Sequence, residues 1–365
     1  MQKTFSDVCA DITRQATKIP QSQYLSSGKY KIFDQGKEYI GGYSDNEEGV
    51  IKDAPFIVFG DHTRVIKYVD EACYIGADGV KLLKVIDENF IPKYVYYSLL
   101  ARPIANVGYS RHFKFLKELL FSVVDKQIQK KRVMQLDEIS NCIDIKSKQL
   151  IELDELIKSR FVEMFADVSV NDKNWVTQVL SSLGTLKNGM NFHYDDKGVS
   201  VRVLGVGDFK DNSVINNAEN LSLVTLAETP AADYYLQNHD LIFVRSNGNK
   251  ALVGRCVEAL PNDVPTVFSG FCIRFRCESD AVKIKYLLYF FKQDEIRAKI
   301  AGRGANIQNL NQKILSAIDV PLPPLELQNR FAEFVQKTEQ AKTIVKQQIA
   351  DLQELLDSKM EEYFG

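Results

Sequence analysis

Apolar residues recur at heptad-like steps along two stretches of the chain. In the first stretch the step is strictly seven residues, and in the second it alternates between three and four. Neither stretch contains Gly or Pro between residues 126 and 165 or between 325 and 364. Such a seam predicts a long helix that buries one side against a partner helix. The predicted seam residues are Leu136, Ile143, Leu150, Ile157 and Met164 in the first helix, and Val345, Ile349, Leu352 and Leu356 in the second.

The segment before each long helix has a different pattern. Short strand-like runs, among them 55–59, 79–83, 240–244 and 271–276, are separated by turn residues such as Ser-Asn-Gly-Asn at 246–249. Helical stretches are expected near 92–101 and 281–301. This pattern predicts a mixed α/β domain, present twice.

The chain contains an internal repeat. Residues 149–160 resemble residues 348–359 at an offset of 199, and 94–97 resemble 286–289 at an offset of 192. The order is therefore globular segment, long helix, globular segment, long helix. The predicted boundaries are 1–124 for the first globular domain, 125–167 for the first long helix, 168–319 for the second domain and 320–365 for the second long helix.

Two duplicated helices that pair antiparallel would relate the globular domains by an approximate two-fold axis. Forty helical residues span roughly 60 Å, more than a small domain requires. We therefore expect a stiff coiled-coil spacer. The alternative is a pair of ordinary long helices in the core of a helical bundle.

Composition and charge limit the class of protein. Hydrophobic residues make up 45% of the chain and charged residues 26%, which is typical of a globular protein. The formal net charge of −2 is unlike that of a protein that coats DNA non-specifically. Six cysteines without a CxxC pair and four widely spaced histidines predict neither a disulfide framework nor a metal site. With no apolar run long enough to cross a bilayer and no secretory signal, we expect a cytoplasmic protein without membrane contact.

Several motifs occur in a particular order in the second half of the chain. They are Trp175 with Leu183-Gly184, the segment Asp240–Gly248, Leu252–Arg255, Ser269–Arg276, Gly302–Leu310, and the proline-rich Val320–Gln328 that enters the second helix. In the first half, Phe59–Thr63 and Gly76–Val80 occupy the matching places. Together these motifs resemble the specificity subunits of type I restriction–modification enzymes, and the resemblance covers essentially the whole chain. The first copy departs from the pattern in that it lacks the Trp and the proline-rich entry.

This resemblance implies a protein that recognises DNA without catalysing a reaction on it. In that family each globular domain is a target recognition domain for one half of a split DNA sequence. The helix pair sets the gap between the halves and docks two modification subunits. Those subunits carry the S-adenosylmethionine site and methylate adenine, while separate restriction subunits cleave. No cofactor, metal or catalytic residue is expected in this chain.

Polar loops supply the candidate DNA contacts in the second domain. A glycine-containing loop after a strand offers a guanidinium, two carboxamides and an ammonium, which suit guanine edges, adenine edges and phosphates. An ordinary hairpin turn would have the same composition. A second amide-rich segment is similar, with a plain connection as its alternative. The candidates are Arg245, Ser246, Asn247, Asn249 and Lys250 in the first loop, and Arg303, Asn306, Gln308 and Asn309 in the second.

The first domain has different polar residues in the corresponding places, as two readers of different half-sites should have. The candidates are Arg64 and Lys67, with Arg111, His112 and Lys114.

Two other functions stay open. One is a coiled-coil scaffold whose globular domains bind protein partners, which suits the net charge of −2. The other is an enzyme in which the Gly-Val-Gly of 205–207 binds a nucleotide, although a strand end is the simpler interpretation of a lone GxG.

Overall fold

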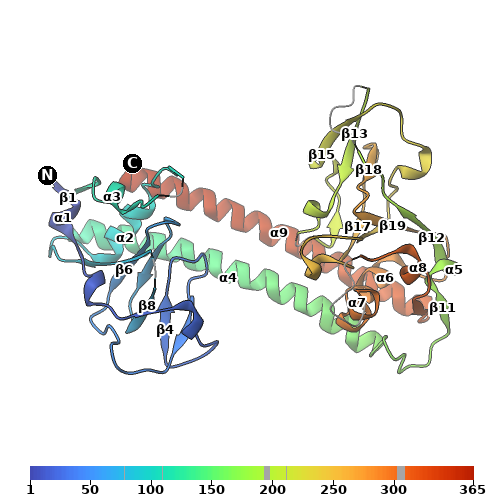
Figure 1. Ribbon diagram of the computed structural model, residues 1–365, viewed down its shortest axis with the longest axis horizontal. Coiled ribbons are helices and arrows are strands. Elements are labelled where there is room, and N and C mark those ends of the chain that lie inside the picture. Colours follow the sequence, from blue (N-terminus) through green and yellow to red (C-terminus); the bar gives the residue numbers. More distant parts are fainter. Residues whose placement is uncertain (78, 109, 193–197, 211, 302–308) are drawn as a thin grey trace. The chain divides into compact units, whose positions relative to one another are not determined.

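The computed structural model describes residues 1–77, 79–108, 110–192, 198–210, 212–301 and 309–365 (Figure 1). The described chain divides into two units. Unit 1 comprises Met1–Gln149 with Val345–Gly365, and unit 2 comprises Leu150–Ile344. Each long helix contributes one part to each unit.

Unit 1 is built from two four-stranded sheets and a two-stranded ribbon. The first sheet has the order β2 (Cys9–Asp11), β9 (Val80–Val85), β6 (Phe56–Gly60), β7 (Ile66–Val69). The second has the order β3 (Lys18–Ile19), β8 (Cys73–Gly76), β4 (Tyr30–Phe33), β5 (Gly42–Ser44). The ribbon pairs β1 (Gln2–Thr4) with β10 (Leu120–Ser122). Three short helices accompany them: α1 (Phe5–Val8), α2 (Pro92–Leu100) and α3 (Phe113–Leu116).

Unit 2 contains a five-stranded sheet, a three-stranded sheet and a ribbon. The larger sheet has the order β12 (Gly184–Asn188), β19 (Cys272–Cys277), β16 (Asp240–Val244), β17 (Cys256–Ala259), β14 (Val214–Ile215). The smaller has the order β15 (Ser222–Leu226), β13 (Val199–Leu204), β18 (Thr266–Phe268), and the ribbon pairs β11 (Thr177–Val179) with β20 (Asp319–Pro321). Its short helices are α5 (Leu180–Leu183), α6 (Ile284–Phe290), α7 (Asp294–Ala301) and α8 (Gln312–Ser316).

The two units share one backbone plan. In each, four antiparallel strands follow the same order, β2-β9-β6-β7 in unit 1 and β12-β19-β16-β17 in unit 2. In each second sheet, a parallel pair (β4 with β8, β13 with β18) is joined by one antiparallel neighbour. The mixed α/β fold expected twice from the sequence is therefore confirmed. The expected helical stretch at 281–301 is two helices, α6 and α7.

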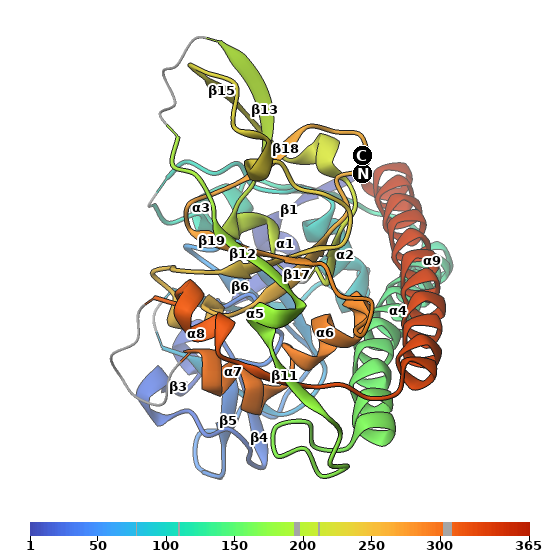
Figure 2. The ribbon, with the colours of Figure 1, turned by 90° about the vertical axis from the view of Figure 1, so that its right-hand side faces the viewer.

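The two long helices are α4 (Lys126–Phe165) and α9 (Leu325–Phe364). In unit 2 they run antiparallel: Asp154 accepts a hydrogen bond from Lys342 at 2.7 Å, while Phe161, further along α4, packs on Phe331, which is earlier on α9. Figures 1 and 2 show these two helix parts side by side. In unit 1, Arg132 near the start of α4 donates to the carbonyl of Tyr363 near the end of α9 at 2.9 Å. The expected antiparallel pairing of the helices is thus present in unit 2.

None of the predicted seam residues is exposed to solvent. Three are buried and six are half-buried. The buried ones are Leu136, Ile157 and Val345; the half-buried ones are Ile143, Leu150, Met164, Ile349, Leu352 and Leu356. Near the end of α4, Phe161 and Phe165 belong to the core of unit 2 and pack on Tyr286 of α6.

A buried glutamine attaches each globular domain to its long helix. In α4, the Gln129 amide nitrogen donates to the carbonyls of Asn89 (2.8 Å) and Val124 (2.7 Å), and its oxygen accepts from the Ile91 amide (2.9 Å). Ile91 is the residue before α2, so this bond caps that helix.

Gln328 of α9 repeats the arrangement 199 residues later. It donates to Ala281 (3.1 Å) and Pro323 (2.7 Å) and accepts from the amide of Lys283, the residue before α6, at 2.8 Å. Both glutamines are fully buried. This offset equals that of the repeat within the long helices, and the bonded residues Ile91 and Lys283, 192 residues apart, follow the offset of the globular segments.

We expect Gln129→Ala and Gln328→Ala each to lower the free energy of unfolding by about 1–3 kcal/mol, because each leaves buried backbone groups without hydrogen-bond partners. Urea unfolding measures the change. Gln127→Ala and Gln348→Ala serve as controls, since both side chains are exposed on the same helices. Equal stability of the buried and exposed variants would contradict this role of the glutamines.

Candidate functional site

The first candidate loop of unit 2 follows β16, a strand whose five residues are all buried. The Arg245 amide donates to the Phe271 carbonyl at 2.8 Å, and its guanidinium donates to the Gly270 carbonyl at 3.3 Å. Ser246 forms an antiparallel bridge with Asn309. The loop is therefore attached both to the β18–β19 turn and to the segment before α8. Arg245 is half-buried, so only part of its guanidinium is available for a ligand.

The two asparagines of this loop stabilise its conformation. The Asn247 side-chain oxygen accepts from the Asn249 amide at 2.8 Å, and the Asn249 oxygen accepts from the Ala251 amide at 3.0 Å. Such side-chain-to-backbone bonds are typical of Asn in turns. An amide oxygen has two lone pairs and the amide nitrogen is a donor, so both side chains can still bind a further polar group.

A hollow of about 380 Å³ lies beside this loop. It is lined by Ser246, Asn247, Gly248, Lys250, Phe271 and Asn309. Asn249, Lys250 and Asn309 are exposed. The structure thus brings six predicted site residues to one place: Arg245, Ser246, Asn247, Asn249, Lys250 and Asn309. Arg303, Asn306 and Gln308 lie outside the described residues.

In unit 1 the exposed candidates lie around α3. Arg111 and Lys114 are exposed, and the Lys114 ammonium lies 4.8 Å from the centre of the Phe115 ring. Arg64 is half-buried with a φ of 64° and donates to the Ile104 carbonyl at 3.1 Å. It therefore connects the β6–β7 turn with the segment that follows α2.

Two predicted site residues of unit 1 are buried, and the structure removes them from the candidate interface. Lys67 on β7 is 3% exposed and donates to the Glu38 carbonyl at 2.6 Å and to the Asp34 carboxylate at 3.4 Å. Burial lowers the pKa of Lys67. His112 is 0% exposed, with its Nδ1 3.0 Å from the Asp61 carbonyl oxygen. Neither side chain reaches a surface on which DNA could bind.

The candidate loops of the two units occupy equivalent backbone positions. The Asp61 amide donates to the Gly79 carbonyl at 2.6 Å, as Arg245 does to Phe271, and the Asp61 carbonyl accepts from the amide of His112 at 2.9 Å. In unit 2, the Arg245 carbonyl accepts in the same way from Leu310 at 2.7 Å. Asp61 is buried, and its carboxylate accepts from the amide of Phe113 at 2.7 Å, so it caps α3. The same backbone site therefore holds a capping carboxylate in one unit and a guanidinium in the other.

The sequence analysis did not identify Phe271, the exposed aromatic residue beside the hollow, as a site residue. Phe271 is 61% exposed, although its segment has the apolar pattern of a core strand. The Ser-Gly pair at 269–270 is the sequence signal that could have identified this residue, because Ser and Gly after the run that forms β18 indicate a turn. Phe271 itself therefore lies outside β19.

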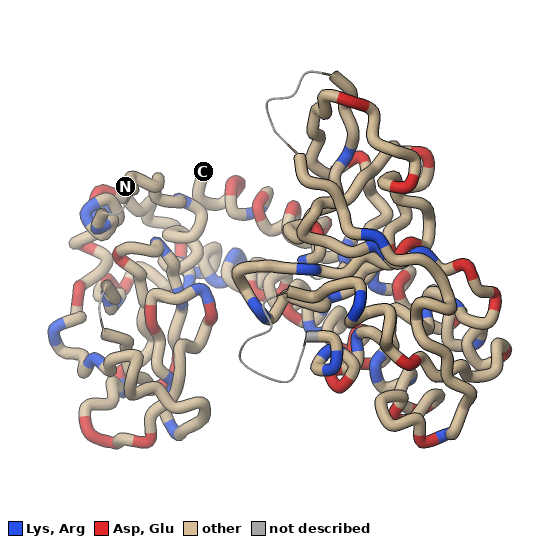
Figure 3. The backbone as a smooth tube through the Cα atoms, turned by 45° about the vertical axis from the view of Figure 1, so that its right-hand side comes forward, with Lys and Arg blue, Asp and Glu red and all other residues tan. Residues whose placement is uncertain are grey.

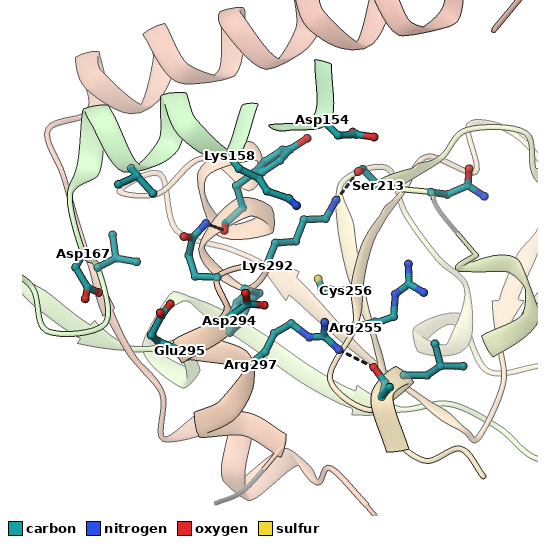
Figure 4. A pocket seen from close by; sticks show the side chains of 18 of the residues that line it. Asp154, Lys158, Asp167, Ser213, Arg255, Cys256, Lys292, Asp294, Glu295 and Arg297 are labelled. Carbon is teal, nitrogen blue, oxygen red and sulfur yellow. Dashed lines mark hydrogen bonds between the residues drawn. The ribbon is translucent and has the colours of Figure 1, made fainter. Parts of the chain in front are cut away.

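A larger cavity of about 800 Å³ lies on unit 2 (Figure 4), and Ala251 and Leu252, which follow the candidate loop, are among the residues that line it. Arg297 of α7 donates to the Ala251 carbonyl at 2.8 Å, directly after the loop, and Lys292 donates to the Ser213 hydroxyl. Burial lowers the pKa of Lys292 to about 8. The buried thiol of Cys256 lies in the same wall, and burial raises its pKa. The hydrogen bond from Arg297 holds the base of the candidate loop to α7.

The Gly-Val-Gly segment is a strand end, as the simpler interpretation had it. Leu204 ends β13, and Val206–Asp208 form a single 3₁₀ turn in which the Asp208 carboxylate accepts from the Gly205 amide at 2.8 Å. Within the described ranges, no three His, Cys, Asp or Glu side chains are grouped so that they could hold a metal ion. A search of the same residues finds no helix with the length and hydropathy needed to span a membrane.

Comparison with known proteins gives a consistent result. The family model described as the type I restriction modification DNA specificity domain matches residues 1–155 and 172–354. The specificity subunit of the type I restriction enzyme StySPI from Salmonella potsdam is 26% identical over 303 residues, covering 75% of this chain and 64% of that protein. The specificity subunit of EcoKI from Escherichia coli K12 is 25% identical over 292 residues, covering 72% of this chain and 61% of that protein. The chain thus spans less than two thirds of the length of these curated relatives.

A solved structure supports the fold. The type I restriction–modification S subunit from M. genitalium matches with a TM-score of 0.60 at 15% identity, covering 100% of this chain and 96% of that one. At this identity the likeness establishes the fold alone.

Stability should depend on pH through Lys292. Its folded pKa of about 8 lies below the ordinary value of 10.5. Between these values the unfolded chain binds a proton that the folded chain does not, so the free energy of unfolding should rise with pH through this window. Lys292→Met should remove most of that rise, and Lys173→Met, at an exposed position, should keep it. Urea unfolding on both sides of the window tests this; equal pH slopes in wild type and Lys292→Met would contradict it.

Proposed function

This chain belongs to the family of type I restriction modification DNA specificity domains, and we propose that it recognises a bipartite, asymmetric DNA site. Each unit reads one half-site, and the chain docks modification subunits onto the bound DNA. The chain itself performs no chemistry. S-adenosylmethionine binding and adenine methylation belong to the modification subunits, and cleavage belongs to separate restriction subunits.

One observation carries this proposal: a single backbone plan holds two different sets of side chains at equivalent loops. Asp61 and Arg245 occupy the same place in their units, as do Gly79 and Phe271. Phosphate contacts position a protein on DNA, whereas side chains at base edges determine sequence. Two frameworks of one shape with unlike contact residues suit two half-sites of unlike sequence.

The net charge of −2 is compatible with DNA binding if positive charge is concentrated locally. Lys and Arg positions are interspersed with Asp and Glu positions in both units (Figure 3). In unit 1, Arg111, Lys114 and Lys117 are exposed within seven positions on and beside α3. In unit 2, Lys250 and the half-buried Arg245 lie in the loop beside the hollow.

Exposed apolar side chains on the long helices support the docking of protein partners. On α4, Met134 is 58% exposed, Ile151 64% and Val162 52%, and on α9 Ile344 is 60% exposed. Contacts between proteins bury such residues. In this proposal the modification subunits cover them. The same residues also suit the alternative, a coiled-coil scaffold that binds proteins only, so DNA binding is the property that separates the two functions.

Phosphate contacts by Arg111 and Lys114 would make binding depend on salt. We expect Arg111→Gln and Lys114→Gln each to reduce the slope of log K against log salt by about 0.9 for each lost phosphate contact. Fluorescence anisotropy measures this, with the chain in complex with its modification subunits and a labelled genomic duplex library. Lys52→Gln is the control, because it removes the same charge at an exposed position of unit 1 away from α3 in sequence.

An unchanged slope in both α3 variants would remove this surface from the interface. A complex that assembles with its protein partners but shows no salt-dependent DNA binding would contradict the proposed function and favour the scaffold.

A further inference from the structure

Phe271 is a large apolar side chain presented to solvent beside the loop of unit 2, and it is 61% exposed. A single exposed apolar residue is common on protein surfaces. This one differs in two respects: its backbone is held on several sides, and polar groups surround it.

Hydrogen bonds fix the backbone that carries the ring. The Phe271 carbonyl accepts from the amides of Arg245 (2.8 Å) and Ser246 (3.4 Å), and the Cys272 amide closes the turn onto Ser269 at 2.8 Å. The preceding Gly270 donates to the Met190 carbonyl at 2.7 Å.

Gly270 cannot be replaced without a shift of its surroundings. A Cβ atom there would lie 2.2 Å from the Asn191 side-chain oxygen and 3.4 Å from the Met190 carbonyl oxygen. The turn is therefore packed closely against the neighbouring segment. The exposure of Phe271 follows from this hydrogen-bonded turn, and binding through a fixed backbone loses less conformational entropy than binding through a loose loop.

The surroundings of the ring are those of a site for a planar polar ligand. Phe271 forms one wall of the 380 Å³ hollow, and its other walls carry the carboxamides of Asn247 and Asn309 and the ammonium of Lys250. A surface that docks a protein usually has a cluster of apolar residues at its centre, whereas the described residues that line this hollow place one aromatic ring beside amides, a hydroxyl and an ammonium group. In the major groove of a duplex each base pair exposes its edge, and an aromatic ring with adjacent hydrogen-bonding groups suits such an edge: the ring contacts a thymine methyl, and the amides bond to the neighbouring donors and acceptors.

We propose that Phe271 packs against the exposed edge of a base in the half-site that unit 2 recognises, with that edge facing Asn247 and Asn309 at the hollow. This inference rests on the proposed function and identifies a specificity-determining residue within it. The ring supplies apolar contact with the base, and the two amides discriminate its edge.

Unit 1 cannot make the same contact. Gly79, which occupies the equivalent backbone position, has a φ of +65°, and a Cβ there would lie 2.7 Å from the His62 ring and 2.8 Å from the Gln35 amide. A side chain is therefore excluded on both conformational and steric grounds. The aromatic contact belongs to one half-site only, so the other half-site provides an internal control.

The test uses the full chain in complex with its modification subunits and a duplex library with randomised positions, with the bound fraction sequenced. Wild type should select a two-part site. Phe271→Ala should lose preference at one or two adjacent positions of one half-site and leave the other half-site unchanged. On the selected duplex, its affinity should fall about 5- to 150-fold, the range expected for the loss of one specific base contact.

Three further variants sharpen the result. Phe271→Tyr keeps the aromatic face and should retain the wild-type preference, and Phe271→Leu keeps an apolar side chain without that face and should lose it. Val176→Ala, which truncates a side chain that is 73% exposed elsewhere in unit 2, should behave as wild type. If Phe271→Ala lowers the melting temperature, the Tyr and Leu variants decide the question.

Unchanged preference and affinity in Phe271→Ala and Phe271→Leu would overturn the inference. So would loss of the modification subunits from Phe271→Ala, since that would assign the ring to a protein contact. A wild-type complex that selects no sequence would instead contradict the proposed function itself. The two failures are therefore distinguishable.

Discussion

The attachment of each globular domain to a long helix by a buried glutamine is the constraint on which the rest of the structure depends. Gln129 and Gln328 each satisfy two backbone carbonyls and the amide before a short helix. A buried amide with all its partners fixes direction as well as distance, because each bond has a preferred angle. In unit 2 the aromatic contacts of Phe161 and Phe165 with Tyr286 reinforce the same junction. A domain held in this way cannot turn freely about its helix. Recognition of a defined DNA sequence requires such a fixed orientation.

In both units main-chain hydrogen bonds hold the candidate loop in place, whereas the side chains of the loop supply the groups available for recognition. The amide of Asp61 or Arg245 donates to the β-turn, and the carbonyl accepts from the following segment, whichever side chain is present. Since these bonds use main-chain atoms, the side chains are free to differ. In unit 1 the side chain caps α3, and in unit 2 it forms part of a polar loop beside an exposed ring. Recognition can therefore change in one unit without altering the fold of either.

The sequence predicted the long helices, the duplicated α/β domains and the polar loop after β16, because periodicity and turn residues are local signals. Burial of polar residues depends on distant partners and was not predictable. Lys67 was expected on the surface, but its acceptors are at Glu38 and Asp34, about thirty residues away. Phe271 was expected within a strand, although the Ser-Gly pair at 269–270 is a local signal for the turn that places it outside β19. The glutamines had a recognisable signal, because they obey the 199-residue offset of the repeat.

The most direct test of the central claim, that one chain carries two unlike DNA readers, is to map methylated adenines in genomic DNA exposed to the chain assembled with its modification subunits. The account predicts methylation at a site of two short, different sequence blocks separated by positions at which every base occurs. Methylation at a single continuous or palindromic sequence would contradict it, because two unlike units could not then each read their own half.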